Sequence, residues 1–271
     1  MAASPCFSPG SDGPRSSSLW IENICSDMSE LHVVALSGGK DSTAMALRLA
    51  EVEPRDYVYV CTPTGRELPE MFDHWKKVAV LLGKPIVPVV GGSLFTLIRQ
   101  QGCIPNFRQR FCTRMLKIEP YAAWLLQQAK THERVVSYVG LRADESEREG
   151  GDYLNIPGVE MRFPMREWDW GMSEVLDYLA ERGVTIPVRT DCDVCFFQRL
   201  AEWYRLWKEH PSEWAEGEAI EKEMGHTFRT PGRDTWPVSM EGLRLRFEAG
   251  DVPTKSINRE LKEMQCRVCR I

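Results

Sequence analysis

The stretch that decides the fold is Leu31–Glu51, LHVVALSGGKDSTAMALRLAE. The short apolar run Val33–Leu36 is typical of a buried parallel strand, and Thr43–Glu51 consists of strong helix formers. The SGGKDS segment between them is therefore predicted to be a tight turn that leads from a strand into a helix.

The composition of this turn predicts a phosphate-binding site. Gly38 and Gly39 let the backbone approach a ligand closely, and Lys40 adds a positive charge. Ser37 and Ser42 add hydroxyl groups. The N–H groups at the start of the following helix have no partner inside the helix and attract anions. We therefore expect phosphates to bind here, with Lys40 also as a catalytic candidate.

Asp41 is the acidic member of the turn and a second catalytic candidate. A carboxylate beside a phosphate is expected to meet a metal ion such as Mg²⁺ or to orient Lys40. The GxxxxGK[ST] spacing of a Walker loop is absent. An ordinary Gly-Gly turn is the alternative, but it does not require the lysine, the aspartate and the two serines around it.

The hexapeptide SGGKDS after a first strand resembles the SGGxDS signature of the PP-loop group of ATP pyrophosphatases. The resemblance implies an α/β fold of the adenine nucleotide alpha hydrolase type, a doubly wound parallel sheet.

Length and composition indicate a soluble globular protein. The chain has 271 residues, of which 43% are apolar and 27% charged. We expect a disordered Ser/Pro/Gly-rich leader at residues 1–18, an α/β domain at 19–190 and a cysteine-containing helical extension at 191–271. No apolar run approaches the roughly 20 residues of a membrane span. A cytoplasmic location is predicted, with no membrane partner.

Strand and helix patterns alternate along the chain, which predicts a parallel doubly wound sheet. The later expected strands are Tyr57–Cys61, Ile86–Val90 and Val135–Val139, and the expected helices are Leu68–Gly83, Ser93–Gln101 and Lys117–Lys130. Within Met161–Gly183, a further helix is expected to bury Val175, Leu176 and Leu179 on one face.

Polar side chains follow the strands at the sheet edge where ligands bind in such folds. Thr64 lies in TPTGREL, and Arg142, Asp144 and Glu145 lie in GLRADE. We expect Thr64 to contact substrate and Arg142 to clamp a phosphate. Glu145 is a catalytic candidate, since a carboxylate here can hold Mg²⁺ or accept a proton. Salt-bridged surface loops are the alternative.

A basic stretch surrounds one cysteine in IPNFRQRFCTRMLKIEP. Its cations are expected to lower the pKa of the Cys112 thiol. In a chain of net charge −5, such a stretch also predicts an anion-binding surface, for which a DNA backbone is suitable. A solvated basic face is the alternative. The cations are Arg108, Arg110, Arg114 and Lys117.

Nine cysteines include two pairs with CxxC spacing, Cys192/Cys195 and Cys266/Cys269. In an intracellular enzyme this spacing points to metal or redox chemistry before disulfides. The first pair precedes an amphipathic helix whose aromatic stripe, Trp203 to Trp207, is more typical of a core than of a base-stacking surface. Four thiolates suit Zn²⁺ as well as an iron–sulfur cluster. Between the pairs, TFRTPGRDTW carries Arg229 and Arg233 and is expected to reach back to the site.

The segments FCTRMLKIEP and DCDVC are similar to those of phosphoadenosine and adenosine phosphosulfate reductases and of the phosphorothioation protein DndC. The resemblance implies a [4Fe–4S] cluster held by Cys112, Cys192, Cys195 and Cys269 (or Cys266). Two features depart from the reductases. Phe111 precedes Cys112 where they have adjacent cysteines, and the C-terminus CRVCRI lacks their Glu-Cys-Gly segment. Reduction of a sulfonyl group is therefore not expected.

Phage proteins usually labelled as such reductases are similar from about Val33 to Cys269, including TPTGxELPEM, GLRADE, CFFQRxxEW and HTFR…GRDTWP. Some are proposed as thymidine pyrophosphorylases or amino acid:DNA transferases. If the chain is phage-encoded, its expected location is the cytoplasm of the bacterial host. This resemblance implies transfer of an amino acid co-substrate to pyrophosphorylated 5-hydroxymethyluracil in DNA, with release of pyrophosphate. Alternatives are an ATP-dependent sulfurtransferase or a reductase acting on a free nucleotide, and a non-enzymatic, metal-stapled module that only binds nucleotide or nucleic acid.

Overall fold

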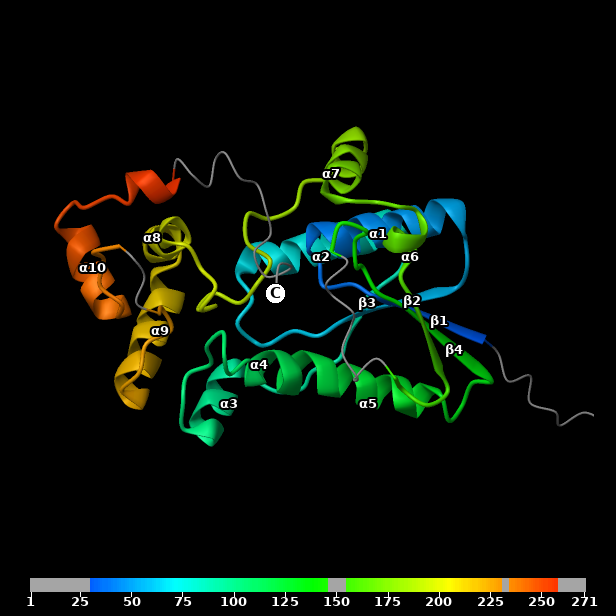
Figure 1. Ribbon diagram of the computed structural model, residues 1–271, viewed down its shortest axis with the longest axis horizontal. Helices are drawn as coiled ribbons and strands as arrows, with labels where there is room; N and C mark the ends of the chain where they lie inside the picture. The colour runs from blue at the N-terminus through cyan, green and yellow to red at the C-terminus, as the bar shows by residue number, and fades with distance from the viewer. Residues whose placement is uncertain (1–29, 146–154, 231–233, 258–271) are drawn as a thin grey trace, which may run out of the picture.

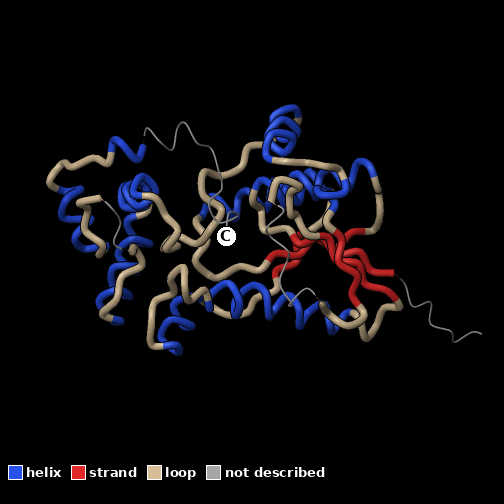
Figure 2. Tube along the Cα trace, viewed as in Figure 1, coloured by secondary structure: helices blue, strands red, loops and turns tan. Residues whose placement is uncertain are grey.

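Five parallel strands form the centre of the protein, and the expected α/β architecture is confirmed (Figure 1 and Figure 2). The computed structural model describes residues 30–145, 155–230 and 234–257. The strand order is β3-β2-β1-β4-β5. The strands are β1 (Glu30–Ala35), β2 (Tyr57–Cys61), β3 (Ile86–Pro88), β4 (Arg134–Tyr138) and β5 (Val159–Arg162).

Helices cover both faces of this sheet (Figure 1). One face carries α1 (Lys40–Val52), α2 (Pro69–Leu82), α6 (Pro164–Glu167) and α7 (Met172–Glu181). The other carries α3 (Leu94–Gln101), α4 (Phe111–Thr113), the π-helical turn η1 (Arg114–Ile118) and α5 (Glu119–Gln128). The order in which the strands are added to the sheet reverses between β1 and β4. Open α/β sheets bind their ligands at such a point.

The two-residue period of β1 divides the core. Val34 packs in the cluster with α1 and α7, whereas Val33 packs with Leu125 of α5 on the opposite face. Both valines are fully buried, as expected for a central strand of a parallel sheet. Burying one such side chain stabilises the fold by about 1.5–3 kcal/mol.

Several elements differ from the sequence expectations. Helix α1 begins at Lys40, so Asp41 and Ser42 lie in its first turn rather than in the preceding loop. Strand β5, VEMR, has no apolar run to signal it. In α7, Leu176 is 39% exposed and Tyr178 lies on the buried face instead, because that face follows the helical period from Val175.

The helix predicted at Lys117–Lys130 instead forms one continuous helical segment from α4 through η1 to α5. Within it, the N–H of Glu119 bonds the carbonyl of Arg114, five residues back. This π-helical turn inserts an extra residue into the helix between Cys112 and the part of α5 that packs on the sheet.

A helical extension lies beyond the carboxyl ends of the strands (Figure 1). Its aromatic side chains form a core with α3, which confirms the structural interpretation of the stripe that includes Trp203. Trp203 is fully buried and meets Trp214 edge to face. The extension consists of α8 (Leu200–Glu209), α9 (Pro211–Met224) and α10 (Met240–Glu248).

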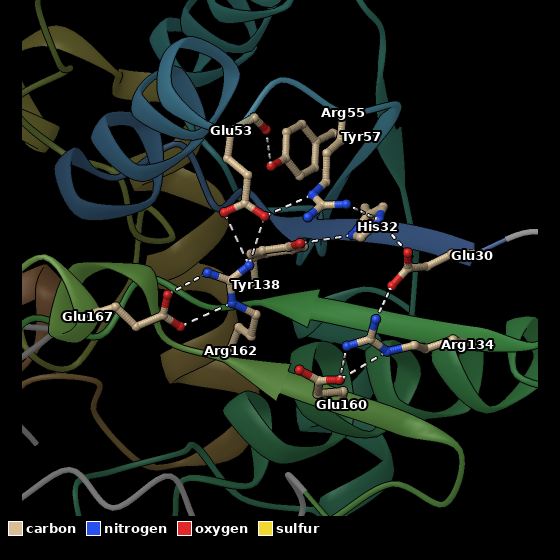
Figure 3. A network of polar contacts seen from close by, with 10 residues as sticks. All are labelled: Glu30, His32, Glu53, Arg55, Tyr57, Arg134, Tyr138, Glu160, Arg162 and Glu167. Carbon is tan, nitrogen blue, oxygen red and sulfur yellow. Dashed lines mark hydrogen bonds and ion pairs between the residues drawn. The ribbon is translucent and has the colours of Figure 1, made fainter.

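A polar network joins β1, β4 and β5 to the turn after α1 (Figure 3). Arg162 contacts Glu53 at 2.9 Å and also Glu167, while His32 Nδ1 lies 2.8 Å from the Tyr138 hydroxyl. Each residue labelled in Figure 3 bonds to another member of the network. Its charges are therefore satisfied internally, and we interpret the network as structural.

One buried carboxylate organises the loop between α9 and α10. Glu221 accepts hydrogen bonds from the backbone N–H groups of Phe228 at 2.8 Å and Met240 at 2.6 Å. Burial raises the pKa of Glu221 to about 7, although the two backbone hydrogen bonds lower it.

This raised pKa predicts a pH-dependent stability. Between its ordinary value near 4.5 and about 7, Glu221 binds more protons in the folded state than in the unfolded state. Its contribution is therefore fully present below pH 4.5 and is lost as the pH rises through 7. Relative to Glu221→Gln, the wild type should lose up to about 3 kcal/mol of unfolding free energy between pH 4.5 and pH 8. Urea denaturation measures this difference.

The matched control is Glu223→Gln, an exposed position on the same helix. Its difference from the wild type should vary far less with pH. A flat difference for Glu221→Gln over this range would contradict the burial of an ionisable carboxyl at this position.

Candidate functional site

The SGGKDS turn is held in shape by its own serines. The Ser37 and Ser42 hydroxyls lie 2.9 Å apart, and Ser42 Oγ also contacts the carbonyl of Gly39 at 3.1 Å. The N–H of Gly38 donates to Ser42 Oγ at 3.2 Å, and the N–H of Gly39 donates to Ser37 Oγ at 3.3 Å. The predicted phosphate-binding residues thus come together in one turn at the N-terminus of α1.

Gly38 fixes the shape of this turn. Its φ is 86°, and a Cβ placed there would lie 2.5 Å from Trp75 Nε1 and 2.8 Å from Met71 Cε. Trp75 Nε1 donates to the carbonyl of Ser37 at 3.1 Å. Gly39, by contrast, has φ −70° and room for a methyl group. The backbone geometry therefore requires glycine at position 38 and not at position 39.

This difference predicts unequal effects of one substitution. Gly38→Ala should destabilise the fold by about 2–4 kcal/mol, because it adds a strained φ and an overlap with Trp75. Gly39→Ala is the matched control and should change stability by less than about 1 kcal/mol. Thermal unfolding of both variants tests this. Equal losses would show that the turn is not held as described.

Lys40 and Asp41 form a buried pair at the start of α1. Lys40 Nζ lies 3.3 Å from Asp41 Oδ2. Asp41 is thus in contact with Lys40, and its expected role in orienting Lys40 stays a prediction. Lys40 is only 8% exposed. The expectation that Lys40 lies in the turn before the helix is therefore wrong, because α1 begins at Lys40 and the Lys40 side chain lies against Asp41.

Arg142 joins the loop after β4 to this pair. Its Nη1 lies 3.0 Å from both carboxylate oxygens of Asp41, and it is only 4% exposed. Asp144 accepts from Nε at 2.8 Å, and Glu145 lies 3.2 Å from Nη2. Burial lowers the pKa of Arg142, but the surrounding carboxylates, Asp41 first, raise it on balance. Arg142 is thus held in its charged form beside the SGGKDS turn.

Gly140 explains why the two loops meet. A Cβ at this position would lie 3.3 Å from the backbone nitrogen of Ser42, so the strand end packs directly against the first turn of α1. Sequence reasoning did not single out this glycine beyond its place at a strand end. The phosphate, Mg²⁺ and proton-accepting roles of Arg142, Asp41 and Glu145 stay predictions.

The loop after β2 is organised by Glu67. This carboxylate accepts from the Thr64 N–H at 2.7 Å, the Thr64 hydroxyl at 2.8 Å and the Gly65 N–H at 3.0 Å. Thr64 is buried and lines a small cavity that also contains the cysteines. Its predicted contact with substrate therefore depends on that cavity.

Three of the predicted ligand cysteines line this cavity of about 40 Å³. They are Cys112, Cys192 and Cys195, and the thiols of Cys192 and Cys195 are hydrogen bonded to each other. No group of three or more His, Cys, Asp or Glu side chains within residues 30–145, 155–230 and 234–257 has the arrangement of a metal site. Cys266 and Cys269 lie outside the described residues, as does Arg233. The ligand set stays a prediction.

The expected low pKa of the Cys112 thiol is wrong. Burial raises this pKa and the neighbouring Cys192 adds to the effect, whereas Lys117 lowers it. Arg110 and Lys117 line the same cavity as Cys112, and Arg114 does not. Arg114 contacts Glu119 at 3.1 Å, and the guanidinium of Arg110 lies 5.2 Å from the centroid of the Phe197 ring.

The loop expected to reach back to the site also differs. Arg229 donates to the carbonyls of Trp236 and Pro237 at 3.1 and 2.9 Å and pairs with Asp234. It is buried in the extension, where it stabilises its own loop.

A buried ion pair that the sequence did not reveal connects the loop after β2 to the loop that carries Cys192 and Cys195, which we call the cysteine loop. Arg66 Nε donates to Asp193 Oδ1 at 3.2 Å, and the N–H of Asp193 donates to the carbonyl of Arg66 at 2.8 Å. The guanidinium also lies 4.1 Å from the centroid of the Phe95 ring. Burial raises the pKa of Asp193, and Arg66 opposes that shift. The pair thereby connects the loops that carry Thr64 and Cys192, both of which line one cavity.

Removing this pair from one side should loosen the cysteine loop. Arg66→Met leaves Asp193 buried without its counter-ion, which should cost about 3 kcal/mol of unfolding free energy. Alkylation of Cys195 should become faster, because its burial depends on this loop. Mass spectrometry of the modified thiol and urea denaturation measure the two effects.

The control is Arg99→Met, which removes an exposed pair with Glu223 and should cost less than about 1 kcal/mol. The double variant Arg66→Met/Asp193→Leu should recover part of the lost stability. If the double variant is no more stable than the single one, the ion pair is not the reason.

A parallel sheet with the SGGKDS turn at the N-terminus of its first helix places the protein among PP-loop proteins. Residues 31–187 match the model of the phosphoadenosine phosphosulfate reductase domain, and the chain belongs to this family. The match ends just before the cysteine loop.

Curated relatives are similar over parts of their length. An uncharacterized protein of Methanocaldococcus jannaschii is 24% identical over 217 residues, which are 75% of this chain and 44% of the relative. The argininosuccinate synthase of Bacillus subtilis is 32% identical over 98 residues, 35% of this chain and 22% of that enzyme. The chain thus spans less than half the length of either relative.

Two solved structures are similar in fold. The phosphoadenylyl-sulfate reductase of Candida auris, in a phosphate complex, has a TM-score of 0.41 and 16% identity, and the match covers 58% of this chain and 74% of the reductase. The U34-tRNA thiolase NcsA of Methanococcus maripaludis, with its [4Fe-4S] cluster, has a TM-score of 0.43 and 17% identity over 78% and 77% of the two chains. Within the described ranges, none of the helices combines the length and apolar character needed to cross a membrane.

Proposed function

We propose that this protein is a PP-loop enzyme that acts on a pyrophosphate-activated nucleotide, whose phosphates bind at SGGKDS. The observation that carries the proposal is the turn at Ser37–Gly39, which opens α1 and lies against the buried Lys40–Asp41–Arg142 cluster. Helix N-termini and fixed cations stabilise phosphates.

This arrangement suits the departure of pyrophosphate. Negative charge accumulates on a pyrophosphate group as it leaves, and preorganised donors that meet this charge lower the barrier. Arg142 is held by Asp41, Asp144 and Glu145, so its guanidinium is already oriented and charged. The proposed roles are anion stabilisation for Lys40 and Arg142, and orientation of both for Asp41.

For the acceptor, we propose a modified pyrimidine in DNA and an amino acid as the co-substrate, as the phage resemblance implies. The amine nitrogen forms a bond to the methylene carbon of 5-hydroxymethyluracil. The carbon–oxygen bond to pyrophosphate breaks, and its electron pair leaves with pyrophosphate. The amine releases a proton, and Glu145 is the candidate acceptor. Arg108 and Arg114 are the exposed cations of the basic stretch, and Arg114 already pairs with Glu119. Arg108 is therefore the candidate contact for a DNA phosphate.

Sulfur transfer to a nucleotide is the second candidate. It is favoured by the convergence of Cys112, Cys192 and Cys195 on one cavity beside Thr64. Thiolates are the usual ligands of a [4Fe–4S] cluster, so these three cysteines are suitable donors, and Cys269 or Cys266 is the proposed fourth ligand. Zn²⁺ suits the same donors. When bound, the group would either staple the extension or supply sulfur chemistry.

Turnover assays distinguish these candidates. Lys40→Met should lower pyrophosphate release at least about tenfold, because it removes the buried cation at the proposed leaving group. Release should require pyrophosphorylated 5-hydroxymethyluracil DNA and an amino acid, without ATP. Mass spectrometry of the nucleosides identifies the product.

Lys76→Met on α2 is the control, since Lys76 pairs with Asp73 on the exposed side of that helix. If pyrophosphate release requires ATP and the product is thiolated, sulfur transfer becomes the proposed function in place of DNA modification. Unchanged turnover in a folded Lys40→Met variant would contradict the role of the turn itself.

Metal content tests the cysteine site separately. Protein purified without oxygen should contain about four iron atoms and acid-labile sulfide per chain. Cys195→Ser should lose most of this iron, whereas Cys61→Ser is the control because Cys61 lies in β2, away from the cysteine cavity. Colourless protein with one zinc per chain would replace the cluster by a structural zinc site.

A further inference from the structure

A second and larger cavity, of about 430 Å³, lies between α2, residues 185–189 and α8. None of its lining residues belongs to SGGKDS or to the cysteine cavity. Its volume lies within the range of small-molecule sites in proteins, which is about 300–1,000 Å³.

The cavity combines apolar walls with cations. Leu68, Ile186 and Leu206 provide apolar surface, and Lys77, Arg189 and Arg205 provide positive charge. This mixture is typical of sites that hold an organic ligand by its body and orient it by one charged group.

Two of the acidic residues on its rim are already bound to cations. Glu70 lies 3.2 Å from His210 Nε2, and Asp73 lies 3.1 Å from Lys76 Nζ. Lys77 has no ion pair with any residue in the described part of the chain. The third acidic residue of the lining, Glu209, also has no ion pair within the described ranges. The positive charge open to a ligand is therefore that of Lys77, together with the unused Nη1 of Arg189.

Two deeply buried polar side chains line the cavity with hydrogen-bonding capacity unused. Arg189 donates through Nη2 to Asp191 at 2.9 Å and to the carbonyl of Cys192 at 2.6 Å. Its Nη1 is buried with no hydrogen-bond partner within the described ranges, and the same holds for Nε2 of His74. Both side chains are more than nine-tenths buried. Buried polar atoms nearly always have partners, so these two atoms point to a ligand.

We propose that this cavity is a binding site for a small organic anion with an apolar body. The anionic group meets Arg189 and Lys77, and the body packs against Leu68, Ile186 and Leu206. His74 Nε2 forms a hydrogen bond with a polar group on the ligand. The ring of His74 also lies within hydrogen-bonding reach of the Gly38 backbone, so the site borders the SGGKDS turn. It shares no lining residue with that turn and does not depend on the reaction proposed there.

Three probes of one shape test this assignment. Benzoate and phenyl phosphate carry a carboxylate and a phosphate on the same ring, and benzamide has no charge. We expect at least one anion to bind more tightly than benzamide, and the stronger anion identifies the class of the natural ligand. Titration followed by methyl NMR should shift the signals of Val188 and Leu206, which line the cavity, and not that of the exposed Leu176.

Two exposed lysines provide matched variants. Lys77→Met on α2 removes a cation that lines the cavity, and Lys208→Met on α8 removes one that neither lines the cavity nor pairs with an acid of its rim. The first should weaken binding of the anion roughly two- to fivefold, as expected for an exposed charge, and the second should leave it unchanged. Both positions are exposed, so both variants should fold.

The proposal is overturned if neither anion binds more tightly than benzamide, if the shifts fall outside the cavity, or if both lysine variants weaken binding equally. Pyrophosphate binding is measured on the same samples, so that failure of this proposal can be distinguished from failure of the proposed phosphate site at SGGKDS. If pyrophosphate displaces the bound anions, they bind at the SGGKDS turn and not in this cavity, and the proposal is also overturned.

Discussion

The buried contact between Asp41 and Arg142 is the interaction on which the candidate site depends. It links the first turn of α1 to the loop after β4, the two segments that meet where the sheet reverses direction. Breaking a buried pair from one side costs about 3–5 kcal/mol, because the remaining charge is left without a partner. The same contact places Lys40 and Arg142 beside the turn. The stability of the fold and the proposed anion binding therefore depend on the same charges.

The sequence predicted the elements whose pattern is local. The apolar run before SGGKDS and the β-branched run YVYVC have a strong periodic or compositional signal, and both formed strands. Strand β5 has no such signal, because VEMR is a strand only by pairing with β4. Propensity in a short edge strand is decided by its neighbours.

Burial explains the errors at the site. The chain indicated which residue types would gather, including SGGKDS, Arg142 and three cysteines. It did not indicate that Lys40 would be covered or that burial would outweigh nearby cations at Cys112. Partners distant in sequence decide both properties. Arg66 and Asp193, 127 residues apart, were missed for the same reason. Both stand inside motifs, TPTGREL and DCDVC, but neither motif indicates that the two segments are in contact.

The π-helical turn at Arg114–Ile118 affects how this protein is compared with others. An α-helix turns by about 100° per residue, so one inserted residue rotates everything on one side of it by that angle relative to the other. Cys112 reaches the cavity before the insertion, and Leu125 reaches the sheet after it. A relative with a regular α-helix here can keep both contacts only by being one residue shorter. An alignment without a gap at this turn would therefore pair Cys112 with a residue on a different face of the helix, and the thiol would look absent from a protein that retains it.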